Sequence, residues 1–472
     1  MSDQGLLLGF DVGTTCLKAL LVDSEGTEVG VSVVATPFQP RVERVEMEVE
    51  ALRDALHLVL EGLGDARRQV AAVAITGMAE CGAPLDGQDR ALAPVIAWHD
   101  PRGAEAVATL ERRFGDEVPR RIGQRLRTVS SVAKLGWLAS HGVVGVCRWL
   151  GVPELCLFTL TGAQVTDYSL AARTGCYDIT ARQWWPEVPA TLGIAVGVFP
   201  TVAAAGTVLG LTSASSSSSS GLPAGIPVTL AGHDHLAALA GSGAGPGDHG
   251  NSVGTAESVV VATTALPDLD RALALRVAVT LQPSGDGWAA LAGAARAGRA
   301  IEAVSDALGL SPSELDDEVA GAEAAGPEAA GAGTVDLRDL LESVAQGRRP
   351  ALPPGPPGRV WDALLRALSE RTWEAVGRAT ALVGPPSRLV VFGGGSHSRP
   401  WLEAKADVGA HAGAGVGLGV WRSGAGEAAA RGAALYAGTA AGWWSSPAQA
   451  PRPALEEIGA GGGAQGPQDV RP

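Results

Sequence analysis

The tripeptide Val-Gly-Thr occurs at residues 12–14 and again at residues 253–255. A strand-like run follows each copy, at residues 16–23 in the first case and 257–263 in the second. A repeat spaced by about half of the 472 residues predicts a duplicated domain in which each copy holds one tight turn between strands. The length supports two domains, because single hydrophobic cores stop growing near roughly 250–300 residues.

The first 77 residues read as an α/β unit. Three strand-like runs at 6–10, 16–23 and 27–36 are separated by short turns and predict an antiparallel meander. Apolar residues on one helical face predict a helix over 50–69, and a buried strand follows at 70–77. The predicted order is β-β-β-α-β. In the second half, a helix over 360–383 precedes a strand that ends in three glycines, and a helix over 398–408 comes next.

The turn after the first strand has the chemistry of a phosphate site. Gly13 permits a tight bend, Thr14 and Thr15 supply hydroxyl and backbone donors, and Lys18 adds a positive charge. Asp11 could hold a magnesium ion through water. An ordinary hairpin is the alternative, but the duplication favours two phosphate turns, the second at Gly254-Thr255.

A second candidate is the stretch at residues 228–241, where an apolar run ends at Gly232 and small residues follow Asp234. This pattern predicts a strand-to-helix junction, which is a place where ligands collect in open α/β sheets. Asp234 could there accept the proton of a substrate hydroxyl, or it could be a helix N-cap. His233 and His235 flank it, but H-D-H lacks the spaced partners of a zinc centre, so we do not predict a metal site from them.

Composition excludes several classes of protein. With 46% hydrophobic and 18% charged residues the chain is predicted to be globular, and a net charge of −14 argues against nucleic acid or an anionic membrane surface as a partner. Five scattered cysteines support neither a disulfide framework nor a zinc site. The start lacks a basic leader and no apolar run reaches membrane-spanning length, so a cytoplasmic location is expected.

Seven motifs in register resemble the FGGY family of carbohydrate kinases. The resemblance runs from residue 6 to about residue 444, and no single motif decides it. They are DVGTT at 11–15, W-x-D-x-R at 98–102, LTG…TDYS…RTG at 160–175, GHDH at 232–235, GTAE at 254–257, GGGSHSRPW…AD at 393–407 and GEAAARGAALYA at 426–437.

The resemblance implies two actin-like, ribonuclease H-like domains with βββαβ cores and an active site in the cleft between them. The N-terminal domain would span residues 1–254 and the C-terminal, ATP-binding domain residues 255–444. Residues 445–472, rich in Ala, Gly and Pro, are expected to be disordered. We also expect the serine run at 213–220 to be a solvated loop.

The resemblance further implies ATP and Mg²⁺ as cofactors, with a small sugar, ketose or polyol as the acceptor. Asp234 would be the general base and His235 would donate to a sugar hydroxyl. The adenosine role is carried to Gly394, Gly395 and Ser398, although a bare strand-to-helix connection is the alternative for these residues. A homodimer is one assembly open to such a protein.

The substrate loop departs from the family pattern. Where the family has Gln-Met-His or Gln-Arg-Glu, this chain has Met78, Ala79 and Glu80, which puts a plain xylulokinase assignment in doubt. Glu80 could accept hydrogen bonds from vicinal hydroxyls, and Met78 or Trp98 could cover an apolar sugar face. Asp100 and Arg102 could bind substrate or tie down their loop.

Three other classes stay open at this stage. A chaperone or actin-like ATPase and a pseudokinase without turnover are compatible with the fold, as is an enzyme with a different acceptor.

Overall fold

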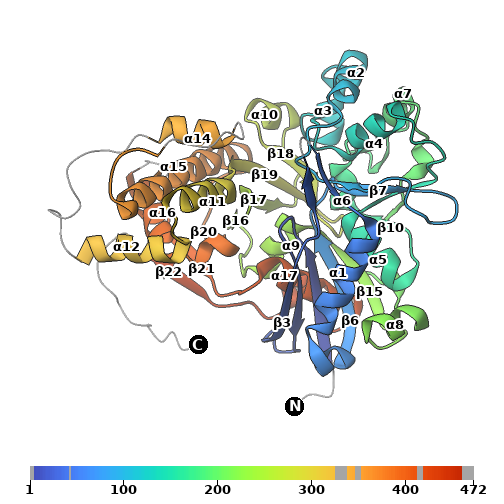
Figure 1. Cartoon of the computed structure of the whole chain (residues 1–472), viewed down its shortest axis with the longest axis horizontal. Coiled ribbons are helices and arrows are strands. Elements are labelled where there is room, and N and C mark those ends of the chain that lie inside the picture. The colour runs from blue at the N-terminus through green and yellow to red at the C-terminus, as the bar shows by residue number, and fades with distance from the viewer. Residues whose placement is uncertain (1–4, 42–43, 325–336, 346–351, 412–417, 460–472) are drawn as a thin grey trace.

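The computed structural model describes residues 5–41, 44–324, 337–345, 352–411 and 418–459. Two large sheets form the centres of two lobes (Figure 1). Helices α9 (Asp234–Gly241) and α17 (Ala428–Ala440) lie between the sheets, because their small apolar side chains pack into clusters with strands of both. Within the described residues, no helix is both long and apolar enough to cross a membrane.

The first sheet has six strands in the order β14-β15-β6-β1-β2-β3. Strands β1, β2 and β3 form the predicted antiparallel meander. Strand β6 pairs in parallel with β1, and β15 pairs in parallel with β6. Helices α1 and α5 cover the face opposite α17. The bounds are β1 Leu6–Val12, β2 Cys16–Val22, β3 Glu28–Ala35, α1 Val49–Glu61, β6 Val70–Gly77, α5 Val152–Thr161, β14 Gly210–Leu211 and β15 Pro227–His233.

The second sheet repeats this pattern in seven strands, in the order β18-β19-β17-β16-β20-β21-β22. Strand β16 pairs with β17 in antiparallel fashion after the Gly254 turn, as β1 pairs with β2, and β20 and β21 add in parallel. The duplication predicted from the two Val-Gly-Thr copies is therefore present. The bounds are β16 His249–Val253, β17 Glu257–Thr263, β18 Ala278–Leu281, β19 Trp288–Ala295, β20 Leu389–Phe392, β21 Val420–Ser423 and β22 Leu455–Ile458.

Glycines allow α9 and α17 to cross at close range. A Cβ atom added to Gly432 would lie 1.8 Å from the Ala237 carbonyl oxygen, and one added to Gly241 would lie 2.1 Å from that of Ala428. A Cβ atom on Gly9 of β1 would lie 1.7 Å from the Ala430 carbonyl oxygen. Larger residues at these positions would push the helix pair off the sheet.

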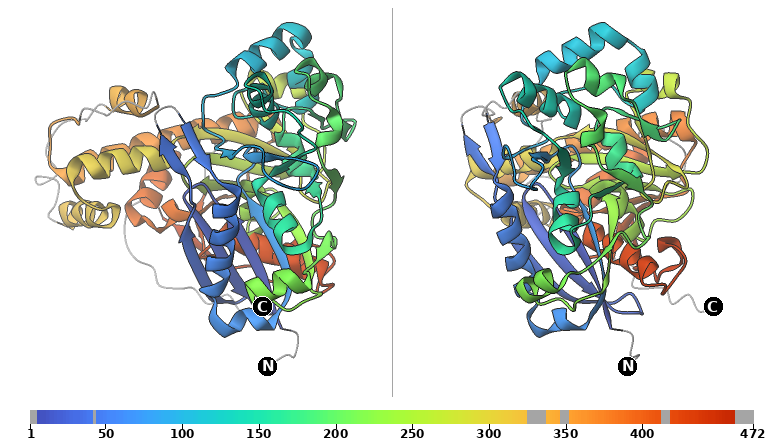
Figure 2. Two further views of the ribbon diagram at one scale, coloured as in Figure 1. Left: turned by 45° about the vertical axis from the view of Figure 1, so that its right-hand side comes forward. Right: turned by 90° about the vertical axis from the view of Figure 1, so that its right-hand side faces the viewer.

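The remaining elements form a five-stranded sheet, two two-stranded sheets and helices around the first sheet, and helices around the second sheet (Figure 2). Those of the first lobe are β4 Gln39–Arg41, β5 Arg44–Met47, β7 Gly82–Leu85, β8 Val95–Ile96, α2 Ala104–Phe114, α3 Glu117–Ile122, α4 Ser131–Ser140, β9 Arg148–Gly151, β10 Val165–Asp167, α6 Tyr168–Arg173, β11 Tyr177–Asp178, β12 Gln183–Trp184, α7 Glu187–Thr191, β13 Thr201–Ala203 and α8 Ala214–Ser220. Those of the second are α10 Leu269–Ala274, α11 Ala297–Leu308, α12 Pro312–Ala324, α14 Arg338–Ala345, α15 Pro357–Val383 and α16 Arg399–His411.

Three predictions need correction. The helix expected over 50–69 ends at Glu61, because Gly64 adopts a positive φ of 59° and a 3-10 turn follows. The serine run forms the short helix α8 rather than a loop: Ser213 caps it, and the Ser216 hydroxyl donates to the Leu160 carbonyl at 2.7 Å.

The tail expected to be disordered from residue 445 instead contains β22, which pairs with β21. Its Ile458 is buried and its Glu456 pairs with Arg399 at 3.0 Å, so specific contacts hold a segment that composition alone assigns to disorder. Residues 460–472 of that tail lie outside the described residues. Strand β16 belongs to the second sheet, so the change from one sheet to the other comes before residue 249, and the domain boundary expected near residue 254 stays a prediction.

Candidate active site

The parallel strands β1, β6 and β15 end side by side and bring three predicted site segments together. Val12 pairs with Gly77, and Gly77 pairs in turn with His233. The phosphate turn after β1, the substrate loop after β6 and Asp234 after β15 therefore share one edge of the first sheet, where ligands collect in such sheets.

The second sheet offers a matching edge. Strands β16 and β20 are parallel neighbours, and a Cβ atom on Gly393 would lie 2.7 Å from the Val253 carbonyl oxygen. Gly254 and Gly394 are exposed, and no atom lies within 4 Å of a Cβ position on Gly394. The backbone at Gly254 and Gly394 is thus accessible, and the predicted contact with a nucleotide stays a prediction. Gly395 is different, because a Cβ atom there would meet Val253 at 2.3 Å.

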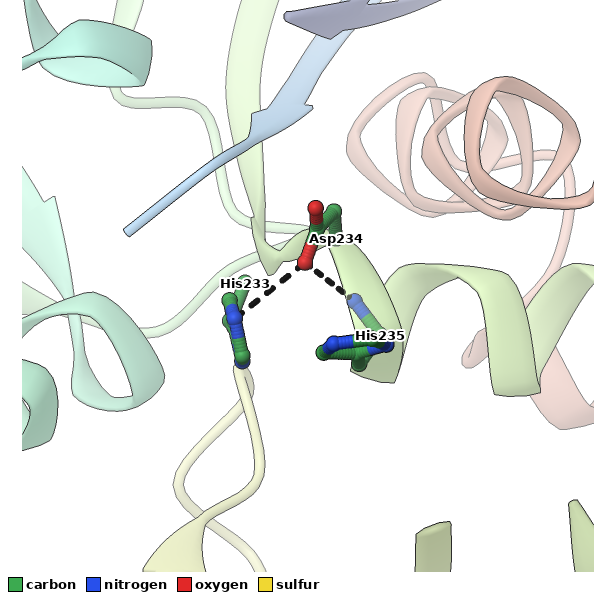
Figure 3. A group of neighbouring side chains, drawn as sticks. All are labelled: His233, Asp234 and His235. Carbon is green, nitrogen blue, oxygen red and sulfur yellow. Dashed lines mark hydrogen bonds and ion pairs between the residues drawn. The ribbon is translucent and has the colours of Figure 1, made fainter. Parts of the chain in front are cut away.

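Asp234 is the first residue of α9 and not its N-cap, which is His233 (Figure 3). Asp234 Oδ1 accepts a hydrogen bond from the His235 backbone N at 2.7 Å and lies 3.2 Å from His233 Nε2. Its side chain is 30% exposed. A carboxylate that one imidazole orients and that still reaches solvent has the geometry of a general base.

His233 is neutral beside this carboxylate. Burial is the main cause that holds its pKa well below the ordinary histidine value, and His235 and Arg173 lower it further. Its Nδ1 is buried without a hydrogen-bond partner, which fits a tautomer that carries the proton on Nε2 and donates to Asp234. The His235 Nδ1 lies 2.9 Å from Ser252 Oγ on β16, so this side chain links the two sheets.

Asp11 has an unsatisfied carboxylate oxygen. Its Oδ1 is buried without a partner, and burial together with the charge of Asp234 raises its pKa to about 8. Lys18 lowers that pKa but is itself paired with Glu427 at 2.5 Å, at the start of α17. The Lys18 ammonium is therefore paired in this structure, and its predicted contact with a phosphate stays a prediction.

The first phosphate turn is braced by its neighbours. The Gly13 backbone N donates to the Cys16 carbonyl at 3.0 Å, and the Thr36 backbone N donates to the Thr15 carbonyl at 2.9 Å. Trp98 Nε1 donates to Thr14 Oγ1 at 3.0 Å, so the Thr14 hydroxyl is partly engaged. Trp98 thus lies against the phosphate turn, and its predicted cover over a sugar stays untested.

The substrate loop differs from its prediction in two ways. Met78 is only 2% exposed and belongs to the core of the first lobe, so it offers no free face to a sugar. Glu80, held at a positive φ of 71°, pairs with Arg173 at 2.5 Å. Arg173 also donates to Gln124 Oε1, while Arg173 Nε and Gln124 Nε2 are buried donors without partners.

Asp100 and Arg102 tie the loop together, which favours a structural role for this pair, and a contact with substrate stays a prediction. Asp100 is buried and accepts from the Val45 backbone N and from the Arg102 guanidinium at 2.7 Å. Arg102 also pairs with Glu46 at 2.5 Å. These bonds engage both charged groups in holding the loop together.

Ser398 occupies the start of α16, where its Oγ accepts from the Trp401 backbone N at 3.3 Å. It therefore caps the helix after the glycine turn, and a contact with adenosine stays a prediction.

Sequence reasoning missed several charged groups around the site. Arg173 and Glu427 lie inside quoted motifs, but their partners are distant in sequence and no local pattern reveals them. Arg296 and Arg299, near the start of α11, lower the pKa of His99, which burial as the largest cause brings to about 4. These arginines place positive charge from the second lobe near the loops of the first.

Comparisons with known proteins agree with this architecture. A model of the N-terminal domain of the FGGY family of carbohydrate kinases matches residues 6–241. An L-fuculokinase from Escherichia coli (strain K12) is 30% identical over 279 residues, which cover 55% of this chain and 57% of that protein. The match therefore spans little more than half of that relative's length.

Two further proteins resemble nearly the whole chain. An autoinducer-2 kinase from Escherichia coli (strain K12) is 28% identical over 504 residues, which cover 94% of this chain and 87% of the relative. The solved xylulose kinase from Rhodospirillum rubrum has a TM-score of 0.77 at 24% identity and covers 96% of this chain and 94% of its own. The last likeness establishes the two-domain, actin-like fold.

Proposed function

We propose, since the chain belongs to the FGGY family of carbohydrate kinases, that it transfers the γ-phosphoryl group of ATP to a hydroxyl of a small sugar, ketose or polyol. One observation carries the proposal. The partly exposed Asp234 and the turn at Gly13 lie at the same edge of the first sheet, and the open turns at Gly254 and Gly394 lie at the matching edge of the second sheet. Phosphoryl transfer needs positioning and charge stabilisation more than covalent chemistry, and such an arrangement supplies both.

Asp234 is the proposed general base. It accepts the proton of the attacking hydroxyl while His233, neutral and buried, holds Oδ1 from the side. A neutral neighbour leaves the carboxylate its full charge, whereas a cationic one would weaken it as a base. His235 is proposed to contact the acceptor with the ring nitrogen that Ser252 does not engage.

The phosphates of ATP are proposed to lie between residues 13–15 and residues 254–255, with the adenosine on Gly394. Backbone N–H groups of such turns bind anions. In a chain with a net charge of −14, the cations must be local, and Arg296 and Arg299 are the proposed ones because Gly298 between them packs against Thr255, where an added Cβ atom would lie 2.8 Å from the Thr255 Cα.

The residues at Asp11 fit a magnesium ion. Asp11 Oδ1 is buried without a partner, and Mg²⁺ prefers such hard oxygen ligands. A divalent cation there would also relieve the repulsion between the carboxylates of Asp11 and Asp234. When bound, Mg²⁺ would neutralise phosphate charge. Asp11 would hold it directly or through water.

The acceptor is proposed to contact Glu80, Arg173 and Gln124. Glu80 supplies acceptor oxygens, while the unpartnered Arg173 Nε and Gln124 Nε2 supply donors. A polyhydroxylated ligand offers both donors and acceptors, and it would satisfy this set better than an apolar ligand.

Acceptor-stimulated release of ADP tests the proposal. The protein with MgATP is assayed against a panel of ketoses, polyols and aldonates. The panel includes L-fuculose and xylulose, because an L-fuculokinase and a xylulose kinase are among the similar proteins. At least one member should raise ADP release well above the rate with ATP alone, and Asp234→Asn should abolish the increase. A panel without any stimulation, with the protein folded, would contradict the proposal.

A further inference from the structure

We propose that His233, Asp234 and His235 form a binding site for a transition-metal ion of the Zn²⁺ class, and that the bound ion inhibits the enzyme by occupying its base. One ligand atom from each of these consecutive residues lies within 4.8 Å of the other two. Figure 3 shows the two imidazole rings on either side of the carboxylate. The binding part stands on this geometry alone, and the inhibitory part rests on the proposed function.

Two of the three ligands are already spaced for a metal. His233 Nε2 and Asp234 Oδ1 are 3.2 Å apart. Two ligands at about 2.0–2.1 Å from Zn²⁺ in a tetrahedron are about 3.3 Å apart, so the separation of this pair suits a metal once the His233 ring turns Nε2 from Oδ1 toward the ion. The partly buried His235 ring must move closer while it keeps its contact with Ser252.

The third ligand has a supporting hydrogen bond. His235 Nδ1 lies 2.9 Å from Ser252 Oγ, which leaves Nε2 as the nitrogen that can face a metal. A hydrogen bond to the second ring nitrogen is the usual support of a metal-binding histidine, because it fixes the tautomer and the ring orientation. Sequence spacing does not reveal this arrangement, since it depends on β15 ending and α9 beginning between His233 and Asp234.

The donor set selects the kind of metal. Two imidazoles and one carboxylate suit Zn²⁺, Co²⁺, Ni²⁺ or Cu²⁺, whereas Mg²⁺ prefers oxygen ligands only. The all-oxygen position at Asp11 and the nitrogen-rich cluster at Asp234 would therefore take different ions.

The site should bind reversibly rather than as a structural zinc centre. It provides three protein ligands and leaves positions open to water. In addition, ligation through His233 Nε2 moves the ring proton to Nδ1, which is buried without a partner. An unpaired buried donor carries a penalty, so the affinity should fall well short of that of a closed four-ligand site.

Inhibition follows from the ligand that the ion takes. A cation on Asp234 Oδ1 draws charge from the carboxylate and makes the remaining oxygen, Oδ2, a weaker acceptor for the proton of the hydroxyl. It also fills the space where that hydroxyl must approach. Zn²⁺ should therefore compete with the acceptor and not with ATP.

Equilibrium dialysis of Zn²⁺ against the full chain, without nucleotide or sugar, tests the binding. We expect one ion that His235→Asn and Asp234→Asn each weaken by about tenfold or more. The control is His141→Gln, which removes an exposed imidazole on the C-cap of α4 and should leave Zn²⁺ binding unchanged. Melting temperatures confirm that each variant is folded.

Substitution by Co²⁺ identifies the ligands, because a thiolate ligand adds an intense charge-transfer band. Spectra without this band support the imidazole and carboxylate set, and a thiolate band that survives in His235→Asn overturns it. Unchanged Zn²⁺ affinity in both cluster variants also overturns the site.

Turnover measured at buffered concentrations of free Zn²⁺ tests the inhibition. An apparent KM for the acceptor that Zn²⁺ does not change refutes the inhibitory part. Absence of turnover with every acceptor refutes the proposed function, while the dialysis result stands.

Discussion

Replacement of Asp234 by asparagine separates chemistry from architecture at the proposed base. The asparagine Oδ1 can keep both contacts of the carboxylate, from the His235 backbone N at 2.7 Å and from His233 Nε2 at 3.2 Å. The side chain is not the N-cap of α9, so no capping bond is lost. An amide cannot take up the proton of a hydroxyl.

The expected stability change is small. Loss of a negative charge from the first turn of a helix costs about 0.3–1 kcal/mol. The same substitution removes the charge that helps to raise the pKa of Asp11, which relieves a repulsion and offsets part of that cost. The melting temperature should therefore move by only a few degrees, since about 1 kcal/mol corresponds to roughly 2–4 °C in a large domain.

The expected kinetic change is large. Removal of a general base typically lowers turnover by about 10²- to 10⁴-fold, while KM for both substrates should change little. Asp268→Asn is the matched control, because Asp268 is an exposed aspartate that caps α10 by accepting from the Arg271 backbone N. Wild-type turnover in Asp234→Asn, with the fold retained, would remove Asp234 from the mechanism.

Three further substitutions test the other parts of the site and the core behind it. Gly394→Val should raise KM for ATP with little effect on the acceptor, because its Cβ position is open and the new side chain would project where the adenosine is placed; an unchanged KM would contradict that placement. Glu80→Gln should weaken acceptor binding by about 1–3 kcal/mol and ATP binding far less, since it breaks the charged pair with Arg173, and equal losses for both substrates would indicate a structural role. Burial raises the pKa of Glu154 from 4.5 to about 7, so its protonation stabilises the fold fully below about pH 4.5 and this stabilisation is lost as the pH rises through about 7. Between about pH 4.5 and 7 the free energy of unfolding should fall by up to roughly 3 kcal/mol less in Glu154→Gln than in the wild type. The same pH dependence in denaturant titrations of both proteins would refute the raised pKa of Glu154.

The sequence predicts several strands of the two large sheets and both turns, because these depend on local patterns. Alternating or continuous apolar runs identify β1, β2, β3, β6 and β20, and the glycines after them mark the turns. The site around Asp234 is predictable for the same reason, since a glycine before an aspartate and small residues after it specify a strand-to-helix junction.

The charged partners are not predictable in this way. Glu80 meets Arg173 and Lys18 meets Glu427 across 93 and 409 positions, and no periodicity encodes such pairs. Asp100 and Arg102 show the converse, because their spacing is compatible with both a ligand site and a loop brace. Only the bonds to Val45 and Glu46 distinguish the two.

The crossing of α9 and α17 explains how the first lobe can hold base and phosphate turn in fixed relation. Asp234 begins α9, which packs on α17 with no room for a Cβ atom at Gly432. The start of α17 carries Glu427, and its pair with Lys18 anchors β2 just after the phosphate turn.

Base and first turn are therefore mounted on one packed unit, where small displacements are costly. The second-lobe turns connect to that unit by β16 and by the contact of His235 with Ser252. Any closure of the cleft must then move the turns at Gly254 and Gly394 toward a first-lobe site whose own geometry is already set. Such closure on a bound acceptor would bring the phosphate to the base and exclude water from the site.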